Sequence, residues 1–221
     1  MLDLDETSRN YLIIMIILAV IVLIIIVMAI MPRREKAGYI HDIVIDNNML
    51  KARIILSNNP KLANATGYYD DAPLHWATSG EIGELLILKG AKINAKDKYG
   101  RTPLHYAVVT GSMNMAEVLI SHGAEINARD SGGVSPLHLV DQSGCRGLKT
   151  QFLSSPAMIK GGNTPLHLAA AIGEKTILEL LLAHNAEINA RNMEKKTPLH
   201  CALENGHTLI GAILIDHGGI V

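Results

Sequence analysis

The hydrophobic residues of the 221-residue chain follow two different patterns. From Tyr11 to Met31 the sequence contains no charged residue, no glycine and no proline. After this run, apolar residues return in short groups at helical spacing, separated by polar stretches that contain glycine. The first pattern predicts one long apolar helix, and the second predicts a series of short helices, each with one apolar face.

The apolar run 11–31 has the length of a membrane-spanning helix, which needs about 20 residues to cross the hydrocarbon core. A secretory signal peptide would have a basic start and a shorter apolar stretch. Here the preceding tail, residues 1–10, carries Asp3, Asp5 and Glu6. A buried core helix would show a polar face, which this run lacks. We therefore predict an uncleaved transmembrane helix over 11–31, preceded by a short acidic tail.

The basic residues beside this helix predict its orientation. Arg33, Arg34 and Lys36 lie in a short linker, residues 32–36, whereas only Arg9 precedes the helix. Basic residues favour the cytoplasmic side, so we expect the rest of the chain in the cytoplasm and the N-terminus on the opposite side. The difference is a few charges, and the reverse orientation stays open. The span has no charge and no Gly-xxx-Gly pattern, so neither ion transport nor helix dimerisation is indicated.

A short motif containing Pro-Leu-His occurs five times in the rest of the chain. The residue before the proline is threonine in three copies and serine in one, and both can cap a helix N-terminus. Proline suits the first helical position, because its missing N–H has no partner there. Ala72 stands at the capping position of the first copy, so we expect that helix to be capped less well. The five histidines are His75, His105, His138, His167 and His200, spaced by 30, 33, 29 and 33 residues.

A period near 33 residues with Thr-Pro-Leu-His-x-Ala resembles the ankyrin repeat. The resemblance implies an all-α repeat solenoid of helix-turn-helix units with finger loops, following the N-terminal transmembrane helix. We expect a degenerate capping repeat first, one divergent repeat in the middle and a truncated repeat last. The predicted boundaries are 37–69 for the capping repeat, 70–99, 100–132, 133–161 for the divergent repeat, 162–194, and 195–221 for the truncated repeat.

Several local features of these repeats are also predicted. Three residues are missing around Ser79, so the first helix of that repeat should be short. Asp97 and Gly100 suit the first and last positions of a type I turn at a finger tip. Asn185 replaces a helix-ending glycine and should take the left-handed conformation. The divergent repeat 133–161 should have an irregular second helix and a lost or shortened finger.

The histidines have structural explanations. In ankyrin repeats the motif histidine typically bonds backbone and the threonine of its own motif, so the resemblance implies a structural role for all five, and His41 is a candidate sixth. Three more histidines recur at the ends of second helices, where a basic side chain complements the helix dipole. These are His122, His184 and His217.

Composition and motifs give no support for catalysis or for nucleic-acid binding. The formal net charge is −1, which provides no basic footprint. Cys145 and Cys201 have no metal-ligand spacing, and we expect thiols rather than a disulfide. No phosphate-binding loop, zinc motif or nucleophile elbow is present. We expect a protein that is not an enzyme and that uses no metal, cofactor or small-molecule substrate.

The remaining prediction is a protein-binding surface at the membrane. Stacked repeats with projecting fingers form extended concave faces that bind other proteins. Positions that vary between repeats on the finger tips and first helices are the candidate contacts. The alternatives are an architectural or regulatory subunit whose transmembrane helix provides specificity, and a secreted protein that inserts in a foreign membrane. The candidate contacts are Lys98, Tyr99, Arg101, Val109, Thr110, Ser131, Ile172, Met193, Glu194, Lys195, Glu204 and Asn205.

Overall fold

A computed structural model of the chain describes residues 33–67, 69–132 and 161–221. The chain divides into two units, residues 1–36 and 37–221, and the description below concerns the second unit. The predicted transmembrane segment 11–31 and the predicted divergent repeat 133–161, except its last residue, lie outside the described residues. Within the described ranges, no helix is both long enough and apolar enough to span a bilayer.

The described secondary structure is helical. A helix pair α2 and α3 comes first, followed by a short 3-10 helix, η1, and then by pairs of a first and a second helix. The helices are α2 (Arg33–Ile45), α3 (Met49–Asn58), η1 (Pro60–Asn64), α4 (Pro73–Trp76), α5 (Gly80–Leu88), α6 (Pro103–Thr110), α7 (Met113–Ser121), α9 (Pro165–Ile172), α10 (Lys175–Ala183), α11 (Pro198–Glu204) and α12 (Thr208–Asp216).

The basic residues predicted as part of a linker are helical, because α2 begins at Arg33. The sequence explains this difference. Pro32 precedes the helix, where proline is well tolerated, and no glycine or proline follows before Gly38. Residues 33–37 are good helix formers, so nothing in this stretch favours a loop.

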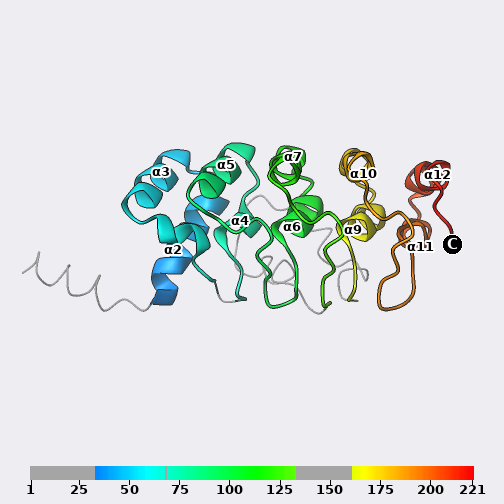
Figure 1. Cartoon of the computed structure of the whole chain (residues 1–221), viewed down its shortest axis with the longest axis horizontal. Helices are drawn as coiled ribbons and strands as arrows, with labels where there is room; N and C mark the ends of the chain where they lie inside the picture. The colour runs from blue at the N-terminus through cyan, green and yellow to red at the C-terminus, as the bar shows by residue number, and fades with distance from the viewer. Residues whose placement is uncertain (1–32, 68, 133–160) are drawn as a thin grey trace, which may run out of the picture. The chain divides into compact units, whose positions relative to one another are not determined.

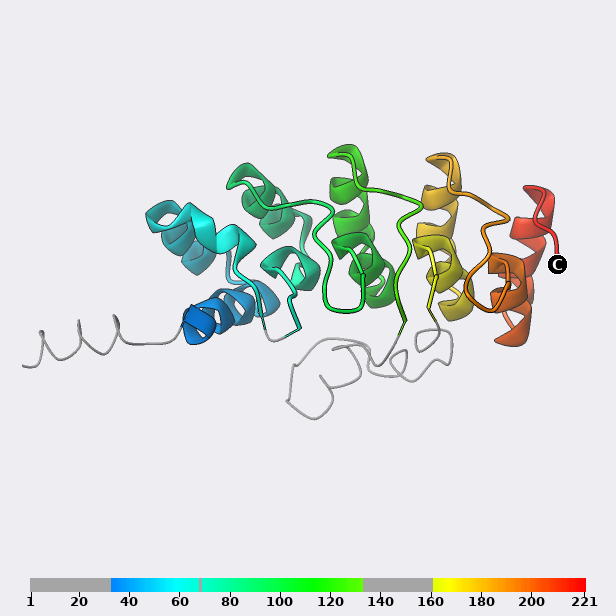
Figure 2. The ribbon, with the colours of Figure 1, turned by 60° about the horizontal axis from the view of Figure 1, so that its bottom comes forward.

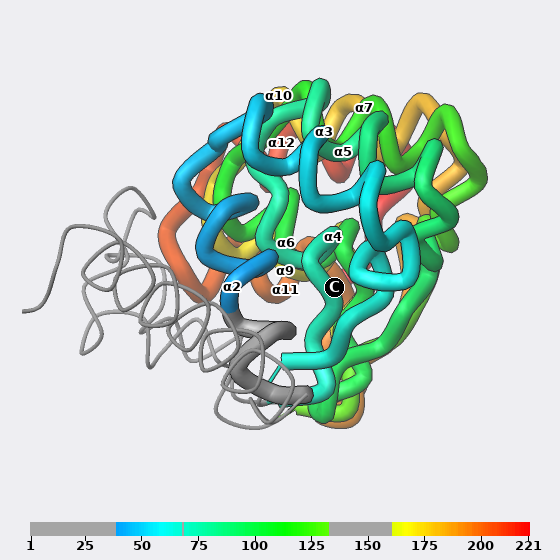
Figure 3. Tube along the Cα trace, turned by 90° about the vertical axis from the view of Figure 1, so that its left-hand side faces the viewer, coloured from blue at the N-terminus to red at the C-terminus, as the bar shows by residue number. Residues whose placement is uncertain are grey.

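Within residues 37–221 the helix pairs stack in a row (Figure 1). The first helices, such as α6 and α9, lie between the second helices and the finger loops (Figure 2). Seen along the row, first helices lie behind one another and so do second helices (Figure 3). The core between the layers is aliphatic, with fully buried side chains such as Leu104, Met115 and Leu166. This arrangement confirms the predicted all-α repeat solenoid in the described part of the chain.

The helix that follows Ala72 is short, as predicted. α4 contains four residues, whereas α6 and α9 contain eight each. Ala72 has no side-chain oxygen to cap the helix, and its own N–H donates to Nδ1 of His75 at 2.9 Å, as the threonine N–H does in the other described copies. The predicted short helix is confirmed. The cap itself does not distinguish this repeat, because the side chains of Thr102 and Thr164 also form no capping hydrogen bond with their helices.

The repeat 100–132 packs directly against the repeat that begins at Gly162. α6 contacts α9, and α7 contacts α10. The finger that starts at Asp130 closes on Asn163, because the N–H of Asp130 donates to the carbonyl of Asn163 at 3.0 Å. The described residues therefore leave no layer between these two repeats. Ser131 and Gly161, which lie on either side of the segment that we predicted as a stacked repeat, are in close contact in this finger.

Candidate binding surface

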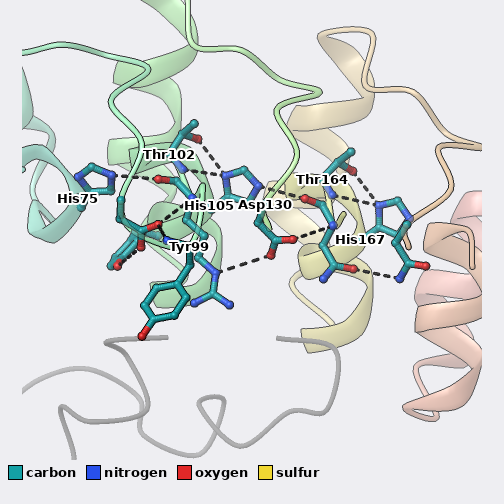
Figure 4. A network of polar contacts seen from close by, with 12 residues as sticks. His75, Tyr99, Thr102, His105, Asp130, Thr164 and His167 are labelled. Carbon is teal, nitrogen blue, oxygen red and sulfur yellow. Dashed lines mark hydrogen bonds and ion pairs between the residues drawn. The ribbon is translucent and has the colours of Figure 1, made fainter. Parts of the chain in front are cut away.

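A ladder of buried histidines fixes each repeat to the next. Nε2 of His75 contacts the carbonyl oxygen of Arg101 at 3.1 Å, and Nε2 of His105 contacts that of Asn163 at 3.2 Å. His167 and His41 continue the row, with the carbonyls of Lys196 at 3.0 Å and Asp71 at 3.1 Å as their partners. Each acceptor precedes a helix-capping position of the following repeat. These contacts are of the kind that the ankyrin resemblance implies for the motif histidine, and Figure 4 shows three of these histidines in line.

The hydrogen bonds also fix the tautomer of the imidazole rings. The backbone N–H of Thr102 donates to Nδ1 of His105 at 3.1 Å, so Nδ1 is the acceptor and Nε2 carries the proton. The hydroxyl of Thr102 lies 2.9 Å from the same Nδ1. Burial lowers the pKa of His105 to about 3 and that of His167 to about 4, against an ordinary value of 6.5. The site favours the neutral imidazole, because a proton on Nδ1 of His105 would point at the backbone N–H of Thr102.

A second ladder runs along the second-helix side and is made of asparagines. Oδ1 of Asn64 accepts from the N–H of Lys92 at 2.8 Å, while Nδ2 donates to the carbonyl of Gly90 at 2.6 Å. The same contacts recur between Asn94 and the next repeat. Asn127 accepts from the N–H of Glu187, which is 60 positions further on. Both ladders thus join repeat 100–132 to the residues that follow Gly161.

At two of the finger tips, the side-chain oxygen of an aspartate or asparagine accepts hydrogen bonds from backbone N–H groups of the turn. Oδ1 of Asp97 accepts from the N–H groups of Tyr99 and Arg101, both at 2.8 Å, and the N–H of Gly100 donates to the Asp97 carbonyl at 2.9 Å. This confirms the predicted turn. Asn192 holds the last finger in the same way, so its unusual sequence preserves the geometry.

Neighbouring finger tips are tied together through their backbones. The N–H of Lys98 donates to the carbonyl of Tyr69 at 2.8 Å, and that of Ser131 donates to the carbonyl of Tyr99 at 2.7 Å. The rings of Tyr69 and Tyr99 lie 6.1 Å apart. At the other end, Met193 donates to the carbonyl of Gly161 at 3.0 Å. The backbone of the row is fixed, while its side chains are available for contact.

Seven of the predicted contacts are exposed. Met193 is 69 % exposed, and Thr110 and Tyr99 are half-buried. The hydroxyl of Thr110 donates to the carbonyl of Tyr106 in its own helix, so that group is already partnered. The exposed candidates on the finger tips and on α11 are Lys98, Ser131, Met193, Glu194, Lys195, Glu204 and Asn205, of which the last two belong to the end of the first helix.

Three predicted contacts are buried and are corrected here. Arg101 is 1 % exposed, with Nε 3.6 Å from Oδ2 of Asp130 and its guanidinium 5.7 Å from the centre of the Tyr99 ring. Val109 and Ile172 are 4 % and 7 % exposed. Variation between repeats suggested exposure. Val109 and Ile172, however, lie on α6 and α9, which are buried along almost their whole length.

An ion-pair cluster joins the last finger to α11. Nζ of Lys196 lies 2.5 Å from Oε1 of Glu204 and 3.4 Å from Oε2 of Glu194. The hydrogen bond to Glu204 raises the pKa of Lys196. Sequence reasoning missed Lys196 and Tyr69 as members of this surface, although both stand at finger positions equivalent to Arg101 and Tyr99.

Other predicted structural residues are placed as expected. Nδ1 of His122 and Nδ1 of His217 each lie 2.8 Å from the carbonyl four residues earlier, at the ends of their helices. Asn185 has a φ of 61° and ends α10 in the left-handed region. His138 lies outside the described residues. Within the described part of the chain, no group of three or more His, Cys, Asp or Glu side chains could hold a metal ion.

Comparison with known proteins identifies the repeats. A family model described as ankyrin repeats (3 copies) matches residues 40–130 and 137–220. Rabankyrin-5 of Mus musculus is 43% identical over 61 residues, which are 28% of this chain and 5% of that protein. NF-kappa-B inhibitor cactus of Drosophila melanogaster is 29% identical over 135 residues, covering 60% of this chain and 27% of that protein.

One relative matches at nearly full length. The probable 26S proteasome regulatory subunit p28 of Saccharomyces cerevisiae is 26% identical over 193 residues, which are 81% of this chain and 85% of that protein. The chain spans only about 5% of Rabankyrin-5 and 27% of cactus. Cactus is named as an NF-kappa-B inhibitor, and p28 as a probable regulatory subunit of the 26S proteasome. The matched repeats and the stacked helix pairs together place this chain in the ankyrin-repeat family.

Proposed function

We propose that this chain is a membrane-anchored interaction module that binds a protein partner through its finger tips and the exposed end of α11. Ankyrin-repeat proteins generally mediate protein–protein interactions, and those named as relatives here include a regulatory subunit. The single observation that carries the proposal is the row of exposed finger side chains on a hydrogen-bonded backbone. Such a pre-ordered surface loses little conformational entropy when a partner binds.

The chemistry of this surface indicates the kind of partner. Met193 offers an adaptable apolar contact at 69 % exposure, and the half-buried Tyr99 offers an aromatic edge. Lys195 adds positive charge next to Glu194, and Lys98 adds positive charge next to Tyr99. A partner with a small apolar knob flanked by charges of both signs fits this arrangement.

Membrane attachment is the part of the proposal that rests on sequence. Residues 11–31 have the length and composition of a spanning helix, and the basic residues that follow favour a cytoplasmic stack. Alkaline carbonate extraction of cell membranes tests the attachment, because an integral protein stays in the pellet. Protease treatment of intact cells tests the orientation, since removal of the repeats from outside contradicts a cytoplasmic stack.

The finger-tip surface is tested by cross-linking the full-length protein to its neighbours in membranes. A variant with Lys98→Ala, Tyr99→Ala and Met193→Ala should lose the cross-linked partner that the wild type captures. A matched control, Glu117→Ala with Glu179→Ala, changes exposed residues on the second helices α7 and α10. Equal capture by both variants would refute the finger-tip proposal. Replacing residues 11–31 with an unrelated apolar helix separates this function from a subunit role in which the span itself recognises the partner.

A further inference from the structure

The ends of the second helices occupy equivalent positions in successive repeats, which the asparagine ladder makes recognisable. In each repeat one N–H donates to Oδ1 of an asparagine in the preceding described repeat. That position is lysine once, glutamate twice and isoleucine once. Counting back from this position, the residue three places earlier is Lys89 in one repeat and His122 in the next. The residue four places earlier is Leu88 in the first of these repeats and Ser121 in the second. The position that donates to asparagine is Lys92, Glu125, Glu187 and Ile220 in chain order.

The second described repeat therefore differs from the others at this edge. Leu88 is 80% exposed, although the equivalent residues are Ser121, Ala183 and Asp216. A leucine at an exposed helix end makes no contribution to the stack. Lys89 and Lys92 flank it and give the edge a positive charge, where later repeats carry histidine and then glutamate or isoleucine.

Lys61 of the preceding repeat belongs to the same edge. It lies in η1, where residues three apart are eclipsed, so Lys61 stands above Asn64. Asn64 in turn bonds Gly90 and Lys92. We call Lys61, Leu88, Lys89 and Lys92 the basic edge.

The charges of the basic edge are not compensated within the described chain. Among the described residues, Lys61, Lys89 and Lys92 form no ion pair, whereas Arg129, Lys175 and Lys196 in later repeats each contact a glutamate. Glu84, one turn before Leu88, is directed to the next repeat, with Oε2 3.5 Å from Nε2 of His122.

We propose that the basic edge docks on the anionic phospholipid headgroups of a membrane surface. A protruding aliphatic side chain flanked by lysines is suited to this interface, because leucine enters the acyl boundary while each ammonium group remains among the phosphates. A nucleic-acid surface would favour stacking aromatics and arginine, which the basic edge lacks. This proposal goes beyond partner binding by the finger tips and uses none of the same residues.

The test measures amine-labelling rates of individual lysines by mass spectrometry. The full-length protein is placed in vesicles of phosphatidylcholine alone or of phosphatidylcholine with phosphatidylserine. On the anionic vesicles, Lys61, Lys89 and Lys92 should be labelled more slowly by roughly fivefold, the factor expected for a lysine held near an anionic surface. High salt should restore the rates, and the distant Lys175 and Lys195 should not change.

The other repeats supply a variant that preserves the fold. Leu88→Ser, Lys89→His and Lys92→Glu together reproduce the residues of the next repeat at this edge. In this variant Lys61 should lose its protection on anionic vesicles, although Lys61 itself is unchanged. Equal labelling of Lys61 on both kinds of vesicle in the wild type would overturn the proposal, as would equal slowing at Lys175. Neither result bears on capture of a partner at the finger tips.

Discussion

Acidification below about pH 6.5 should destabilise this protein through its histidine ladder. The native pKa of His167 is about 4 and that of His105 about 3, because both rings are buried. In the unfolded chain both titrate near 6.5. Below pH 6.5 the unfolded state therefore binds protons that the native state does not, and stability falls as pH falls. The loss continues until the pH reaches the native pKa of each ring.

The magnitude follows from the difference between these pKa values. At pH 5.5 each of the two histidines costs about 1.4 kcal/mol of the free energy of unfolding, so His105 and His167 together remove about 3 kcal/mol. Between pH 5.5 and 4.5 the two contribute a slope of about 2.6 kcal/mol per pH unit. This is a large part of the 5 to 15 kcal/mol (approximately) that holds an ordinary domain together. Burial also lowers the pKa of His75, which acts in the same direction.

Urea unfolding followed by circular dichroism at a series of pH values measures this slope. The variant His167→Gln retains polar atoms but cannot titrate, so it should be less stable at neutral pH and show a slope smaller by about 1.3 kcal/mol per pH unit. His217→Gln is the matched control, since it removes an exposed imidazole. If His167→Gln changes the slope no more than His217→Gln does, burial does not hold the His167 ring neutral and the reasoning is refuted. The wild-type slope remains a test if His167→Gln does not fold.

Two further predictions concern the fingers. Excision of residues 132–160, which joins Ser131 to Gly161, should leave a cooperative thermal transition, because the new finger has the length of the finger at Gly100; loss of that transition would mean that the excised residues support the stack. Lys195→Gly should stabilise the protein by about 1 kcal/mol, since Lys195 has a φ of 63° that strains any residue with a Cβ. Urea unfolding measures that gain, and Lys195→Ala, which keeps the Cβ, should not reproduce it.

The repeated motif was sufficient to predict the helix starts, because threonine, proline and histidine act locally at each N-terminus. Asp97 and Asn185 were also predictable, since a turn and a left-handed cap depend on a few adjacent residues. Which repeats are neighbours in the stack was not predictable in this way. Val134 and Asn163 both precede a capping residue and a Pro-Leu-His, so the sequence offers His105 two carbonyls. Contacts across tens of residues decide between them.

The same reasoning explains the errors at the candidate surface. Arg101 varies between repeats as a contact residue would, but its charge lies beside Asp130 in the next finger. Burial of Val109 and Ile172 depends on neighbours from other repeats, which no local pattern specifies. Local chemistry therefore predicted the framework well and predicted the exposed residues only at the finger turns and at the end of α11.

The acceptors of the histidine ladder are backbone carbonyls, whose positions do not depend on the side chains that follow. Aspartate, arginine, asparagine and lysine all stand at these positions, and each presents the same oxygen to the histidine before it. A hydrogen bond of this kind does not require a particular side chain in the neighbouring repeat. During evolution a repeat could be duplicated, lost or displaced from the row without a matching change in the adjoining repeat. The junction between Asp130 and Asn163 has the form that such an exchange would leave.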